Sequence, residues 1–129
     1  MLDVKALLAK ITDSLICDLL YNSSFTTGTA SLTKSIANYN SLIFVYTDND
    51  GVKHTKRIVT NKSSSVDGIL DVVRVTGAVY VKTMVFNING QTLTASCNRQ
   101  WASNTPTQGS YVTLKKVYGC HSIGGGGTA

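Results

Sequence analysis

The spacing of apolar residues changes near Cys17, and this change constrains the fold more than any other feature of the chain. Before it, apolar residues recur at helical intervals, at Val4, Leu7, Leu8, Ile11 and Leu15. After Asp18, short apolar or alternating runs separated by turn residues continue almost to the end. The sequence therefore predicts a short N-terminal helix within residues 1–17, followed by a β-domain over residues 18–119.

Strong turn signals divide the β-domain into hairpins. The apolar run over residues 41–47 suits a central strand covered on both faces, and Asp48-Asn49-Asp50-Gly51 should turn it back into a strand over residues 52–60. Asn89-Gly90 is the strongest two-residue hairpin signal. About eight short strands with a single helix favour an antiparallel β-sandwich, jelly-roll-like, over a parallel α/β sheet.

Both ends of the chain lie outside this predicted β-domain. Isolated helices shorter than about 12–15 residues are marginal in water, so the apolar stripe of the helix needs a partner surface, either its own sheet or another copy of the chain. Residues 120–129 include four consecutive glycines, Gly124 to Gly127. We expect this Gly-rich segment to be flexible or to lie over a neighbouring chain.

The cysteines form an odd set without a metal-binding pattern. Cys17, Cys97 and Cys120 include no CxxC pair and no His at a zinc-finger spacing, although His121 adjoins Cys120. Free, buried or partly buried thiols are the simplest expectation. A metal site and a disulfide formed after release from the cell remain the alternatives.

The chain carries a net charge of +5, and its basic residues are spread rather than clustered. A spread charge is most simply a solvated surface, but it also allows attraction to a polyanion. Aromatic residues do not alternate with the lysines as in a stacking platform for single strands, which argues against nucleic acid. The densest basic group is Lys53, Lys56, Arg57 and Lys62.

Membrane insertion and secretion are not indicated. The apolar stretches are interrupted well before the roughly 20 residues that a membrane span requires. Asp3, Lys5 and Lys10 interrupt what would be a signal peptide. We expect the protein to fold in the cytoplasm of the cell that makes it.

No combination of residues indicates catalysis or a cofactor. His54 and His121 fall at positions that we expect to be exposed, and every acidic residue is an Asp, most of them in turns or in the helix. The start of a calcium loop in Asp48 and Asp50 lacks the later acidic ligands. The glycine run lacks the Lys-Ser/Thr and the helix of a phosphate loop. The sequence predicts a non-enzymatic protein without cofactor or metal.

Three segments carry a resemblance to a known class of proteins. They are Leu20-Tyr21-Asn22-Ser23-Ser24-Phe25 through Leu32, Ser35-Ile36-Ala37-Asn38-Tyr39 through Tyr46, and Tyr111 through Gly119. Their rhythm of strand, Ser/Thr turn and Asn-Tyr corner resembles a recurring β-domain of bacteriophage tail-fibre and minor virion proteins. The matching parts cover most of residues 18–119, although this chain continues past the usual last strand into Cys120.

This resemblance implies a structural protein of the virion, made in the host cytoplasm. Such domains are often trimeric and touch other virion proteins or the host surface, so we expect a fibre- or knob-like homotrimer that contacts a host-surface polysaccharide. The apolar stripe of the helix would then form a three-chain seam, unless it packs on its own sheet. The seam residues would be Val4, Leu8, Ile11 and Leu15.

An aromatic face can stack on sugar rings and Lys can pair with anionic groups, which suggests where a receptor would be contacted. The candidates are Trp101, Tyr80, Lys53, Lys56, Arg57 and Lys62. Trp101 could instead belong to the core. Two other functions stay open, a capsid decoration or connector protein without a receptor, and a small basic nucleic-acid-binding domain. The chain shows no recognition-helix motif for the latter.

Overall fold

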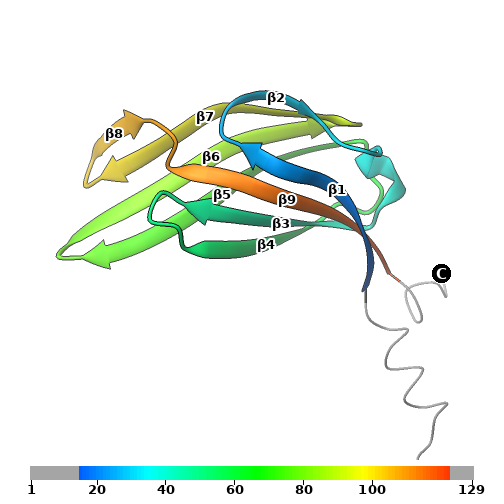
Figure 1. The fold of residues 1–129 in the computed structure, drawn as a ribbon, viewed down its shortest axis with the longest axis horizontal. Helices are drawn as coiled ribbons and strands as arrows, with labels where there is room; N and C mark the ends of the chain where they lie inside the picture. The colour runs from blue at the N-terminus through cyan, green and yellow to red at the C-terminus, as the bar shows by residue number, and fades with distance from the viewer. Residues whose placement is uncertain (1–14, 123–129) are drawn as a thin grey trace, which may run out of the picture.

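Nine β-strands and one short 3-10 helix make up residues 15–122, the part of the chain that the computed structural model describes (Figure 1). The 3-10 helix η1 spans Ile36–Asn38. The strands are β1 Leu15–Phe25, β2 Gly28–Ser31, β3 Ser41–Asp48, β4 Lys53–Val59, β5 Ser65–Thr76, β6 Ala78–Asn89, β7 Thr92–Ala102, β8 Thr105–Gln108 and β9 Val112–Ser122.

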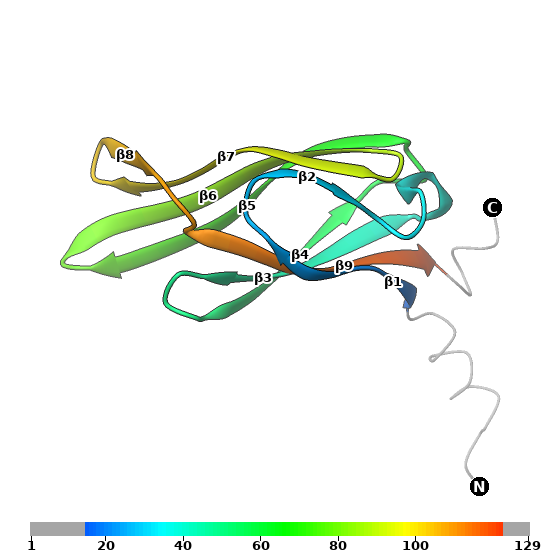
Figure 2. The same ribbon diagram turned by 45° about the horizontal axis from the view of Figure 1, so that its top comes forward.

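The strands form two antiparallel sheets that lie in two layers (Figure 2). The first sheet has the order β1-β9-β3-β4, and the second has the order β2-β7-β6-β5 with β8 paired to β7. The predicted mainly β, antiparallel and sandwich-like fold is therefore confirmed, while its jelly-roll-like detail stays a prediction. In both views the β5–β6 hairpin extends past the β3–β4 turn.

The core lies between the sheets because alternate residues of the long strands, such as β3 and β6, point inward. Phe44 on β3 and Phe86 on β6 are buried, and their ring centroids are 4.9 Å apart. β3 is a central strand as predicted, between β9 and β4. It is not covered on both faces, however, since Ile43 and Val45 on its outer face stay half-buried.

Both hairpins predicted from turn residues are present. In the β3–β4 turn the Gly51 N–H donates to the Asp48 carbonyl over 3.0 Å, and Gly51 has φ +83°, which a residue without Cβ adopts at little cost. Gly90 in the β6–β7 turn has φ +61°. The short strand β8 was not predicted, because its Thr-Pro-Thr-Gln sequence has no apolar alternation.

The predicted boundaries at both ends of the β-domain are wrong. Residues 15–17, expected at the end of the helix, begin β1, and residues 120–122, expected in the tail, complete β9. These two ends pair with each other, Leu15 opposite Ser122 and Cys17 opposite Cys120, so backbone hydrogen bonding extends both strands. The remaining residues of the predicted helix and tail, 1–14 and 123–129, lie outside the described residues.

Cys17 and Cys120 form a disulfide. The expectation of free thiols is therefore wrong for these two residues and confirmed for Cys97. The bond joins β1, at the edge of the first sheet, to its neighbour β9. Neither cysteine's local sequence reveals it, because the pairing joins residues separated by 103 positions.

A buried asparagine connects the second sheet to the start of β9. Asn98 on β7 is 1% exposed, and its amide nitrogen donates to the carbonyls of Thr26 (3.1 Å) and Val112 (2.6 Å). Its amide oxygen accepts from the N–H groups of Tyr111 and Val112, each over 3.1 Å. One side chain thus satisfies four backbone groups, and it fixes where β9 begins.

Removing the disulfide should destabilise the fold. A chain-entropy model gives about 4.7 kcal/mol for a closed loop of roughly 100 residues, and measured losses are typically about 2–4 kcal/mol. We expect the free energy of unfolding of C17S/C120S, measured by urea denaturation, to be lower than that of the wild type by an amount in this range. The C97S variant is the matched control and should unfold at nearly the wild-type midpoint. Equal midpoints for all three proteins would contradict this role.

Substitution of Asn98 should be among the most destabilising polar changes. Asn98→Ala leaves buried backbone donors and acceptors without partners, at a cost of about 1–3 kcal/mol each before relaxation. We expect a loss of at least about 2 kcal/mol in thermal or urea unfolding. Asn87→Ala is the control, since Asn87 is half-buried on β6 and its amide bonds mainly to the exposed Asp67. A loss at Asn98 no larger than at Asn87 would contradict the argument.

Candidate binding cleft

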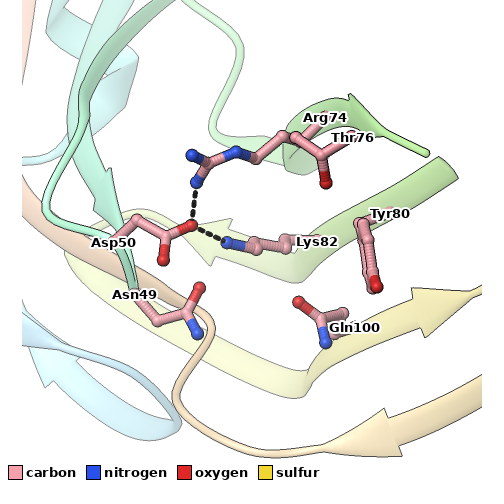
Figure 3. Close-up of a pocket in the computed structure, with 7 residues that line it drawn as sticks. All are labelled: Asn49, Asp50, Arg74, Thr76, Tyr80, Lys82 and Gln100. Atoms are coloured by element: carbon pink, nitrogen blue, oxygen red, sulfur yellow. Dashed lines mark hydrogen bonds and ion pairs between the residues drawn. The ribbon is translucent and has the colours of Figure 1, made fainter. Parts of the chain in front are cut away.

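A polar cleft of about 280 Å³ opens where the β3–β4 turn faces the inner surface of the second sheet (Figure 3). Its residues come from that turn and from β5, β6 and β7. They are Asn49, Asp50, Arg74, Thr76, Tyr80, Lys82 and Gln100.

The strand period places the basic and polar side chains on one face. Lys82 and Tyr80 are in phase with the buried Met84 on β6, so they share its inner face. Cross-strand pairing sets Arg74 of β5 opposite Tyr80 and sets Gln100 of β7 opposite Lys82. These four side chains therefore form a contiguous patch at the end of the inner surface.

Two cations share one carboxylate in this cleft. The Lys82 side chain is only 4% exposed, and its Nζ lies 2.9 Å from Asp50 Oδ2. The Arg74 guanidinium pairs with the same oxygen (Figure 3). The hydrogen bond from Lys82 is the main cause that lowers the pKa of Asp50 below its ordinary value, with further attraction from both cations. At neutral pH this cluster of three has a net charge of +1.

A second aspartate shapes the turn that presents Asp50. Asp48 Oδ1 accepts from the N–H groups of Asp50 (2.9 Å) and Val52 (3.0 Å), and His54 Nε2 lies 3.2 Å from Asp48 Oδ2. Burial alone would raise the pKa of Asp48, but these hydrogen bonds outweigh burial and lower it. The Asp50 side chain is not used by the turn and is free to meet Lys82.

The cleft has donors for an acceptor-rich ligand. An ammonium has three N–H donors and a guanidinium has five, so one carboxylate oxygen leaves most of them available. The Tyr80 ring and the Gln100 amide lie beside the cations (Figure 3). Within residues 15–122, no group of three His, Cys, Asp or Glu side chains could hold a metal ion. The chemistry suits recognition of a polar, anionic group.

The aromatic candidates do not lie together. Tyr80 lines the cleft, as a contact residue should, whereas Trp101 lies on the outer face of the same sheet. Trp101 is half-buried beside Val85 and Cys97, with the Arg99 guanidinium 5.9 Å from its ring centroid. The alternative that Trp101 belongs to the core between the sheets is therefore wrong.

The basic candidates are also separated. Lys53 and Arg57 are exposed on the outer face of β4, opposite the inward side of the strand. Lys56 points inward, and its Nζ donates to the Ile69 carbonyl over 2.7 Å, which gives a partner to one carbonyl of the edge strand β5. Lys62 is exposed in the loop between β4 and β5 with φ +62°. No single surface unites these four residues.

The sequence interpretation missed Asp50, Arg74 and Lys82 as site residues. A local signal existed for two of them, because Arg74-x-Thr76 and Tyr80-x-Lys82 flank the Gly77 turn and so share one face of a hairpin. The sequence did not reveal that Asp50 lies close to Arg74 and Lys82, because this proximity depends on how the two sheets pack.

No protein-family model matches the chain, and no curated protein matches it in sequence. In the described part of the chain, no helix is long and apolar enough to cross a membrane.

The lowered pKa of Asp48 predicts acid sensitivity. The folded-state pKa lies below the ordinary value of 3.8, so its stabilisation is present above that value and is lost as pH falls through the folded-state pKa. We expect the free energy of unfolding to decrease below about pH 4, measured by urea titration between pH 3 and 6. In D48N, stability should change less over this range. An unchanged slope in D48N would contradict this assignment.

Proposed function

We propose that this chain is a non-enzymatic structural protein of a bacteriophage virion, a fibre- or knob-like homotrimer that contacts a host-surface polymer. The contact surface is the cleft around Lys82. The resemblance of residues 18–119 to virion β-domains supports the class of protein. The cleft supports the binding role, because its nearly buried ammonium, its guanidinium and its Tyr80 side chain converge on one open space.

The size of the cleft favours one residue of a polymer as its occupant. Sites for drug-sized ligands measure roughly 300–1,000 Å³, and this cleft of about 280 Å³ lies just below that range. It is also open, and its residues are mainly polar. A repeated surface polymer would gain overall affinity when three copies bind together, even if each contact is weak.

The arrangement of the ends supports attachment at one end and contact at the other. β9 runs from Val112, opposite Asp48 near the cleft, to Ser122, opposite Leu15. Its 11 residues span about 33 Å at the usual rise of a strand. The chain therefore enters the described domain at the end opposite the cleft (Figures 1 and 2). Of the predicted seam residues, Val4, Leu8 and Ile11 precede this point, outside the described residues. Leu15 is the first residue of β1 and so does not belong to a helical seam.

A second candidate function is a capsid decoration or connector protein without a receptor. Large apolar side chains are exposed on the outer face of the β5–β6 hairpin, where Val73 is 61% exposed, Val75 69% and Val79 50%. Contiguous exposed apolar residues often mark protein-protein contacts. This function requires binding to assembled particles and no binding to cells.

The test is co-sedimentation of the labelled protein with a panel of bacterial cells and with purified phage particles. We expect saturable binding to cells of a host, reduced about tenfold or more in K82M because a charged hydrogen bond is lost. K53M is the matched control, since Lys53 is an exposed strand lysine outside the cleft. Binding to particles alone would favour the decoration protein, and equal binding of both variants would remove the cleft from the proposal.

A further inference from the structure

We propose that the cleft binds a carboxylated sugar residue, whose carboxylate competes with Asp50 for Arg74 and Lys82. This inference deepens the proposed function and rests on it for the origin of the ligand in a surface polymer. The chemical class itself follows from the charges, donors and ring surfaces of the cleft.

The charge of the cleft fits a monoanion. Arg74 and Lys82 contribute two positive charges and Asp50 one negative charge, so a single carboxylate brings the group to neutrality. Within residues 15–122, Lys82 Nζ donates to one oxygen, that of Asp50, although an ammonium has three donors. Because the Lys82 side chain is 96% buried, a second hydrogen-bond acceptor stabilises its ammonium more than it would stabilise that of an exposed lysine.

Asp50 is placed to act as an internal competitor. Its side chain is 45% exposed, and the backbone of the turn is held by Asp48 instead. Rotation of the Asp50 carboxylate would therefore leave the turn intact. Without a ligand, Asp50 compensates the buried ammonium, and an incoming carboxylate takes over part of that role.

The neighbours of the cations favour a sugar over a bare anion. Tyr80 offers an aromatic surface on which a sugar ring can pack, with a hydroxyl at its edge. The Gln100 amide both donates and accepts, and Thr76 adds a hydroxyl, so both suit sugar hydroxyls. A phosphate monoester carries about −1.5 to −2 charges at pH 7 and exceeds the charge available.

The first experiment is an NMR titration of the whole chain with three probes, D-glucuronate, D-glucose and acetate. We expect glucuronate to shift the backbone resonances around Tyr80, Lys82 and Gln100 saturably. Glucose lacks the carboxylate and acetate lacks the ring, so each should bind about tenfold more weakly or worse. Acetate binding as tightly as glucuronate would overturn the sugar assignment, and no shift with glucuronate would overturn a carboxylated sugar as the ligand.

Substitutions give effects of opposite sign. Lys82→Met should weaken glucuronate binding about tenfold or more. Arg74→Gln should also weaken binding, and because the Arg74 side chain is 45% exposed, this substitution does not alter a buried position. Asp50→Asn removes the competitor and should tighten binding roughly three- to tenfold. Lys53→Met should leave binding unchanged. Weaker binding in Asp50→Asn would overturn the competition, because Asp50 would then be a ligand-binding group.

The two proposals can fail separately. Glucuronate binding with these signs, without adsorption to any cell, would keep the site and reject the proposed function. Cell adsorption that depends on Lys82, without glucuronate binding, would keep the proposed function and reject the carboxylated sugar.

Discussion

The two-residue period of β6 is the constraint from which the cleft follows. Met84, Phe86 and Ile88 must point inward to build the core, and the same alternation turns Lys82 inward. No shift of register could expose Lys82 without also exposing these three apolar residues. An ammonium removed from water needs a charged partner, since an unpaired buried charge is strongly unfavourable. Asp50 supplies that partner from the β3–β4 turn at the end of the first sheet, so the core pattern and the cleft share one cause.

The position of Asp50 depends in turn on contacts that run through the fold. Asn98 on β7 holds the backbone of Val112, and Val112 lies opposite Asp48 in the pairing of β9 with β3. Asp48 then shapes the turn that carries Asp50. The second sheet thus fixes the start of β9, and the start of β9 fixes the end of β3. The turn that follows β3 then presents the Asp50 carboxylate to the second sheet. This closed path explains why the cleft can be preformed although its residues come from distant parts of the chain.

The sequence predicted what depends on near neighbours. The Asp48–Gly51 and Asn89-Gly90 turns encode their own backbone conformations, so both hairpins follow from turn residues that are adjacent in the sequence. The misses share a non-local origin. Leu15 and Cys120 are strand residues because β1 and β9 pair with each other, and Asp50 reaches Lys82 because the sheets pack. Tyr80 was proposed from its residue type, whereas Lys82 was missed although its two-residue spacing from Tyr80 places both side chains on one face of β6.

The disulfide lies at the end of the first sheet where β1 begins. β1 is an edge strand, and its pairing with β9 shifts register between Leu19 and Tyr21 and again before Phe25. An edge strand with irregular pairing is the element that a pull from the chain terminus would peel away first. The bond from Cys17 to Cys120 passes such a pull directly to β9, which pairs on both sides and runs the length of the first sheet to the cleft end. Under the proposed function, the crosslink therefore lies where the attached end transmits force and the binding end stays undisturbed.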